Sequence, residues 1–203
     1  MCNKERLDGL CESHFTRMTS HERARAFDYL LELVKAGGSE ETINGLFIAD
    51  DGRAIAPVSR LLADATLNEE AQIVVTRHLY EIDIRQDLLC IFTHYMAHPD
   101  AKLRKKAVYY VPADIWSEEL RIALEAMIRT ETEQLARIHA VDKLLRIYGV
   151  DEQSVGEMVY RNIYRGLHSP AAPHEGSSAQ PTCEFVRVRK RCQVIGIRTA
   201  ATC

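Results

Sequence analysis

The chain has 203 residues, of which 46% are hydrophobic and 27% charged, a composition that excludes wholesale disorder, a collagen-like chain and a coiled coil. Its 26 Lys and Arg and 29 Asp and Glu give a net charge of −3, which does not predict a uniformly polyanion-binding protein. The charge is uneven, because residues 168–203 hold five basic and two acidic residues, whereas residues 1–167 hold 21 basic and 27 acidic residues. The length has room for one domain or for a small domain with appendages, and one compact unit is expected.

The cysteines and the apolar segments indicate a cytoplasmic protein. The cysteines occur singly, with no CxxC pair, at positions 2, 11, 90, 183, 192 and 203, which is not the spacing of a disulfide framework. Charged residues interrupt the first 20 positions, where a signal peptide needs an apolar stretch. The most apolar segment, residues 88–96, is far shorter than the roughly 20 residues that cross a bilayer. No membrane partner is expected.

Helical periodicity runs from residue 20 to residue 167, with no alternating strand pattern before the tail, so the predicted class is all-α. Residues 1–19 are treated as an N-terminal extension, and residues 20–67 as a divergent helical unit. In that unit a first helix ends at Gly37 or Gly38, and a second segment runs from Ser39 to a turn at residues 50–52. A third helix is predicted from about Ala56 to Asp64, with Pro57 in its first turn.

Three helix pairs at nearly constant spacing are predicted over residues 68–167. The pairs are residues 69–81 with 85–96, residues 99–111 with 117–129, and residues 131–148 with 151–167. The second and third pairs share a pattern with a period of 33, Asp100-x-x-Leu103-Arg104-x-x-Ala107-x-x-x-Val111 against Glu133-x-x-Ala136-Arg137-x-x-Ala140-x-x-x-Leu144. The first pair follows less closely at a period of 31, through Glu69, Ile73, Thr76 and Tyr80.

The shared pattern has a simple physical interpretation. The small residues Ala107 and Ala140 allow helices to approach closely. An acidic residue four positions before an arginine predicts an ion pair within each helix, between Asp100 and Arg104 and between Glu133 and Arg137. Neither helix of a pair can bury its apolar face alone, so the pairs are expected to stack.

This D-x-x-L-R-x-x-A-x-x-x-V pattern resembles HEAT-like repeats, especially the short variety of phycobilisome-lyase-like repeat proteins. The resemblance covers about residues 69–167. It implies a right-handed α-α superhelix, a stack of HEAT-like helical hairpins, whose second helices line the concave side.

The composition changes after Leu167. The segment HSPAAPHEGSSAQPT is rich in Pro and Ser and has almost no large apolar residues, which is typical of a flexible linker. The segment that follows combines apolar residues at alternating positions with a basic run. Residues 168–203 are therefore predicted to form a flexible basic tail.

No residue pattern indicates catalysis. Cys90, His94 and His98 have the spacing of metal ligands on one helix face, but three successive turns span about 12 Å, too far to share one ion. A packed cysteine and a polar helix face explain them more simply. His174, Cys183, Cys192 and Cys203 match no compact zinc pattern, and nucleophile-elbow, phosphate-loop, HExxH and dinucleotide motifs are not found. The chain is expected not to be an enzyme and to use no cofactor or metal.

A protein partner is the main expectation. Charged and polar residues of the second helices would form a mixed groove suited to a charged protein segment, in an adaptor, regulator or inhibitor. They are Asp87, His94, Glu118, Arg121, Glu125, Arg129, Glu157, Arg161 and Arg165. The alternative is a solvated face with internal Glu–Arg pairs.

Local nucleic-acid binding is the second possibility. Its candidate residues are two basic clusters, Lys102, Arg104, Lys105 and Lys106 on one repeat and Arg187, Arg189, Lys190 and Arg191 in the tail, which could follow a phosphate backbone together with Arg161 and Arg165. Residues 136–150 bear a slight resemblance to helices of phage small-terminase proteins. A third possibility, a lyase-like chaperone for a bilin chromophore, is implied by the repeat type alone.

Overall fold

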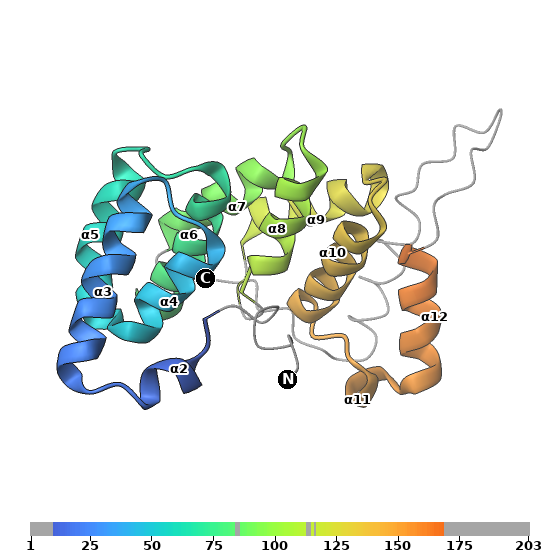
Figure 1. Ribbon diagram of the computed structural model, residues 1–203. Coiled ribbons are helices and arrows are strands. Elements are labelled where there is room, and N and C mark those ends of the chain that lie inside the picture. Colours follow the sequence, from blue (N-terminus) through green and yellow to red (C-terminus); the bar gives the residue numbers. More distant parts are fainter. Residues whose placement is uncertain (1–9, 84–85, 113–114, 116, 169–203) are drawn as a thin grey trace. The chain divides into compact units, whose positions relative to one another are not determined.

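The computed structural model describes residues 10–83, 86–112, 115 and 117–168. Every regular element in these ranges is a helix, which confirms the all-α class for this part of the chain (Figure 1). The chain divides into two compact units, residues 1–91 and 92–203, and each is described by itself. None of the described helices is both long and apolar enough to cross a bilayer.

The N-terminal unit is built around α4. Its elements are α2 (Glu12–Thr16), α3 (Ser20–Lys35), α4 (Glu40–Ala49), α5 (Asp51–Ala63), α6 (Glu69–Asp83), the 3-10 helix η1 (Gln86–Leu88) and the start of α7 (Leu89–Met96). Helices α3, α5 and α6 all pack against α4, and Phe27, Val34, Ile43 and Leu46 are buried between them. Gly37 and Gly38 have φ of 120° and 71°, so the predicted end of the first helix is confirmed.

The start of α5 differs from the prediction. Asp50 ends α4 and also caps α5, where its carboxylate accepts a hydrogen bond of 3.0 Å from the backbone N–H of Arg53. Because this cap starts α5 at Asp51, Pro57 lies inside the helix, and its expected place in the first turn is wrong. Pro57 has no N–H to donate along the helix, so α5 tolerates one missing backbone hydrogen bond at this point.

The C-terminal unit is built around α10. It holds the rest of α7, then α8 (Ala101–Tyr110), α9 (Glu118–Thr130), α10 (Gln134–Ile147), α11 (Glu152–Val155) and α12 (Glu157–His168). Helices α8, α9 and α12 all contact α10. The small repeat residues Ala107 and Ala140 are fully buried, as close helix packing requires.

The acidic residues of the repeat pattern have another role than the predicted one. Asp100 caps α8 by accepting a hydrogen bond of 2.8 Å from the N–H of Lys102, and Glu133 caps α10 by accepting one of 2.6 Å from the N–H of Ala136. A carboxylate at this position satisfies a backbone donor that has no partner inside the helix and faces the positive end of the helix dipole. The ion pairs expected with Arg104 and Arg137 are therefore not formed.

The last predicted helix, residues 151–167, is interrupted. Asp151 caps the four-residue helix α11, and Gly156 then takes a φ of 81° before α12 begins. An L side chain rarely adopts this backbone conformation, so glycine at this position permits the break. Figure 1 shows α11 joining α10 to α12.

Candidate functional site

A groove of about 460 Å³ lies between the C-terminal part of α7 and α9, both second helices of predicted pairs. Its walls carry apolar or small side chains, including the buried Met96 and Met127 and the more exposed Ala97, Ala123 and Ala126. Thr93 and Thr130 add hydroxyl groups. Alanines leave room above the buried thioethers, and methionine adapts its shape to varied apolar partners.

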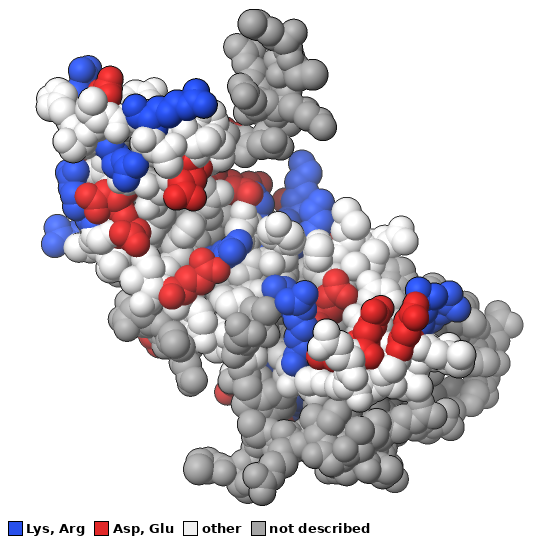
Figure 2. Space-filling model, turned by 90° about the horizontal axis from the view of Figure 1, so that it is seen from below, with Lys and Arg blue, Asp and Glu red and all other residues white. Residues whose placement is uncertain are grey.

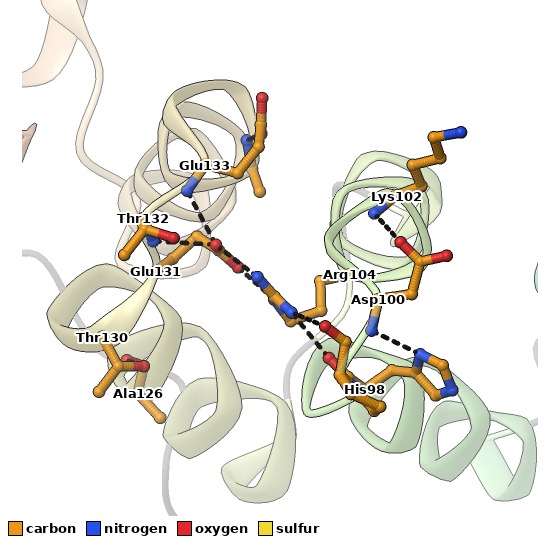
Figure 3. A network of polar contacts seen from close by, with 11 residues as sticks. His98, Asp100, Lys102, Arg104, Ala126, Thr130, Glu131, Thr132 and Glu133 are labelled. Atoms are coloured by element: carbon orange, nitrogen blue, oxygen red, sulfur yellow. Dashed lines mark hydrogen bonds and ion pairs between the residues drawn. The ribbon is translucent and has the colours of Figure 1, made fainter.

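The base of the groove is a salt bridge between Arg104 of α8 and Glu131 (Figure 3). Arg104 donates from Nε to Glu131 Oε2 at 2.6 Å and from Nη2 to Oε1 at 2.9 Å, which is a bidentate pair. Its Nη1 donates to the carbonyls of His98 at 2.9 Å and Pro99 at 2.7 Å. Arg104 thus joins the α7–α8 loop to the residue that follows α9.

Glu131 is held in its charged form. Its side chain is 1% exposed, and Oε1 also accepts the backbone N–H groups of Thr132 and Glu133, each at 2.9 Å. The hydrogen bond from Arg104 is the main reason that the pKa of Glu131 lies below its ordinary value. The same hydrogen bond raises the pKa of Arg104. The base of the groove is therefore a fixed, internally neutralised charge pair.

Four of the predicted partner-binding residues form an ion-pair ladder along α9. Arg121 donates to Glu118 and to Glu125, and Arg129 Nη2 donates to Glu125 Oε2 at 3.0 Å. The hydroxyl of Tyr148 donates to Glu125 Oε1 at 3.4 Å. The hydrogen bond to Glu118 is the first cause that raises the pKa of Arg121.

The ladder and the groove lie on different faces of α9. Residues 118, 121, 125 and 129 follow each other at spacings of three and four and form one stripe. Residues 126 and 127 lie three and four positions after residue 123, and residue 130 lies four and three positions after them, so these four residues form a second stripe. The ladder faces Tyr148, whereas the second stripe lines the groove. Internal Glu–Arg pairing of this kind is the arrangement that the solvated-face alternative describes.

The other predicted partner-binding residues lie on separate elements. Asp87 is on η1 of the N-terminal unit, and His94 is exposed on α7. On α12, Glu157 forms an exposed salt bridge with Arg161, and Arg165 is exposed one turn further along. Of these residues, the structure pairs Glu157 with Arg161 within α12.

The salt bridge with Glu131 removes Arg104 from the basic cluster predicted on α8. Arg104 has its donors engaged by Glu131, His98 and Pro99, so it is not available to a phosphate. Lys102 is exposed, and Lys105 and Lys106 are half-buried. The face in Figure 2 shows basic and acidic side chains interspersed. The predicted tail residues Arg187, Arg189, Lys190 and Arg191 lie outside the described residues.

The described part of the chain contains no group of three His, Cys, Asp or Glu side chains placed to hold a metal ion. Cys90 Sγ donates to the carbonyl of Asp87 at 3.1 Å, and His98 Nδ1 accepts from the N–H of Asp100 at 3.1 Å. These side chains are therefore engaged with local backbone groups.

Sequence reasoning missed the groove itself. It selected charged residues, while the groove is lined mostly by alanine, threonine and buried methionine. The signal that could have found it is the pair Ala123 and Ala126 next to Met127, because small residues on a solvent-facing helix stripe leave a hollow. From the sequence alone, Glu131 is only the first residue of a predicted helix.

Comparisons with protein-family models, with curated proteins and with solved structures found no match. The resemblance to HEAT-like repeats therefore stays a prediction.

Proposed function

We propose that the chain is a non-catalytic protein-binding adaptor, regulator or inhibitor that holds a segment of its partner in the groove between α7 and α9. The groove is the observation that carries the proposal. Its buried methionines and exposed alanines suit an apolar anchor side chain of the partner, as in grooves that accept amphipathic helices. The proposal includes a cytoplasmic location and right-handed stacking of the helix pairs.

The polar side chains of the groove support selectivity more than affinity. Thr93 of α7, Thr130 of α9 and His98 of the α7–α8 loop line the groove beside its apolar walls. Polar groups of this kind exclude wrong partners, while the buried contact supplies most of the binding free energy. The expected partner segment therefore combines one or two apolar anchors with polar flanks.

A matched pair of alanine substitutions tests the proposal. Ala126→Arg fills the groove, whereas Ala63→Arg places the same side chain at the exposed end of α5, in the N-terminal unit. Wild type and both variants are used as bait in nuclease-treated lysate, and the captured protein is then titrated against each variant. We expect Ala126→Arg to bind at least about tenfold more weakly than wild type, and Ala63→Arg to bind like wild type.

Two results would contradict the proposal. One is a partner that binds Ala126→Arg as tightly as wild type, because the groove would then not be its site. The other is captured material that disappears with nuclease or at moderate salt. That result would favour the nucleic-acid alternative, through the lysines of α8 and the basic tail.

A further inference from the structure

A second cavity, of about 760 Å³, lies at the other end of the C-terminal unit, between α10, α11 and α12. It exists because the last helix pair is irregular. The break at Gly156 ends α11 after four residues, and α12 begins directly after it as a separate helix. The two short helices therefore lie around the end of α10. The volume falls in the range of small-molecule sites.

The apolar part of this cavity comes from the core. Ile115, Leu145, Ile147 and Val150 line it, and the aromatic ring of Tyr160 reaches it from α12. The ring of Tyr160 lies 6.1 Å from that of Tyr164, at an interplanar angle of 34°. A ligand there would meet a hydrocarbon surface with an aromatic ring at its side.

The polar part of the cavity is dominated by carboxylates. Asp142, Asp151 and Glu152 line it together with a single cation, Arg146. Asp151 is engaged in capping α11, where it accepts the N–H of Ser154 at 2.7 Å. Within the described ranges, the half-buried carboxylate of Asp142 accepts no hydrogen bond and forms no salt bridge. Burial of a carboxylate beside apolar surface costs free energy unless a donor or a cation satisfies it, so this carboxylate would gain from a cationic ligand.

The electrostatics of Asp142 agree with this geometry. Burial raises its pKa, and the charges of His139, Arg146 and Lys143 only partly offset that effect. The pKa of Tyr160 and of Tyr164 is raised, first by burial and then by the charge of Asp142, so both phenols stay neutral. A cation placed between Asp142 and the Tyr160 ring would be stabilised by the charge of the carboxylate and by a cation–π interaction with the ring.

We propose that this cavity binds an organic ammonium group on an apolar body, with Asp142 as its counter-ion and the ring of Tyr160 against its positive charge. An anion would meet three carboxylates and one arginine. A metal ion would find no set of three ligands among the described residues. The ammonium could belong to a free amine or to a lysine side chain of a partner, and the two sources share the same chemistry. This site is separate from the groove between α7 and α9.

The test is calorimetric titration of the full chain with benzylammonium chloride, with benzyl alcohol as its uncharged counterpart. We expect benzylammonium to bind and benzyl alcohol to bind at least about tenfold more weakly. Asp142→Asn should weaken benzylammonium about tenfold, and Tyr160→Leu should weaken it while Tyr160→Phe retains it, because the ring is kept. Asp64→Asn, at the exposed end of α5, is the matched control and should bind like wild type.

A second ligand distinguishes the two sources. N-acetyl-lysine methylamide carries the same ammonium on a peptide-like body, and tighter binding than benzylammonium would assign the site to a partner lysine, whereas weaker binding would assign it to a free amine. The proposal is overturned if neither ammonium ligand binds at millimolar concentration, if benzyl alcohol binds equally well, or if Asp142→Asn, with an unchanged thermal unfolding curve, binds like wild type.

Discussion

Arg104 and Arg137 occupy the same position of the repeat, 33 residues apart, yet the structure gives them opposite environments. Arg104 forms a bidentate salt bridge with Glu131, whereas the buried Nε of Arg137 has no hydrogen-bond partner in the described part of the chain. The difference follows from the repeat. The residue 33 positions after Glu131 is Tyr164, which cannot supply a carboxylate.

Replacement of the two arginines by methionine should therefore have different effects on stability. Arg104→Met leaves Glu131, with a side chain only 1% exposed, without its partner, and we expect a loss of about 3 kcal/mol in the free energy of unfolding. Arg137→Met removes a buried donor that has no acceptor, so we expect a change within about 1 kcal/mol. Urea unfolding followed by circular dichroism measures both, and equal losses would show that the two environments are the same.

His78 should make the N-terminal unit sensitive to acid. Its imidazole stacks on Phe47 with ring centroids 4.2 Å apart and hydrogen bonds Asn44 at 2.8 Å, and burial lowers its pKa to about 4. The unfolded chain, with a histidine pKa near 6.5, binds more protons than the folded chain between these two values. The contribution of neutral His78 to the free energy of unfolding is thus fully present above about pH 6.5. It is lost as the pH falls toward about 4, and the total loss is about 3 kcal/mol.

The variant His78→Gln isolates this contribution. It keeps an amide that can hydrogen bond Asn44 but cannot titrate, so its unfolding free energy should fall less than that of wild type between pH 7 and pH 4. Carboxylates titrate in both proteins, so the contribution of His78 is the difference between the two curves of unfolding free energy against pH. Parallel curves would mean that His78 binds protons equally in the folded and the unfolded chain over this range.

The sequence predicted the helices better than the interactions between them. Apolar spacing located the helices of the predicted pairs, except that the last of them is broken at Gly156, and the repeat correctly matched Asp100 with Glu133 as equivalent positions. What these two residues do depends on where a helix starts. Helix α8 starts at Ala101 and not at residue 99, and α10 starts at Gln134 and not at residue 131, so each acidic residue is an N-cap instead of an ion-pair partner inside the helix. Arg104 then forms its salt bridge with a residue 27 positions away, which no local pattern indicates.

The two corrected helix ends have the same kind of cause. Pro57 was expected near a helix start because proline removes a donor, but the cap at Asp50 fixes the start earlier. Apolar spacing continues across Gly156 and so predicts an unbroken helix there, because spacing does not reveal a positive φ. The groove and the cavity arise from such details and from the side chains that the packing leaves uncovered, so neither could be predicted from composition.

Two glycine-to-alanine substitutions should change stability in opposite directions. At Gly156 the φ of 81° is unfavourable for alanine, although a Cβ would meet no other described atom within 4 Å, and we expect a loss of about 1 kcal/mol from the backbone alone. Gly52 lies in the first turn of α5 without a positive φ, and there alanine should add about 0.5 kcal/mol.

Thermal unfolding of both glycine variants tests this, and a stabilised Gly156→Ala would contradict it. The substitution should also weaken benzylammonium binding, because Gly156 lies between the two helices that border the cavity.

The ladder on α9 should contribute to stability chiefly through Glu125. Its side chain is 13% exposed, and it accepts hydrogen bonds from Arg121, Arg129 and Tyr148. Glu125→Gln should cost about 1–2 kcal/mol, because Arg121, with a side chain 18% exposed, keeps only one carboxylate partner. Glu118 is 58% exposed, and Glu118→Gln should cost less than about 0.5 kcal/mol.

The salt dependence of unfolding separates the two positions of the ladder. Raising the salt concentration should reduce the small effect of Glu118→Gln toward zero, whereas the effect of Glu125→Gln should largely persist, because partly buried pairs are screened less. If both variants unfold like wild type, the ladder does not stabilise α9. Its charges would then be available to a partner, and the surface opposite the groove would become the stronger candidate for the interface.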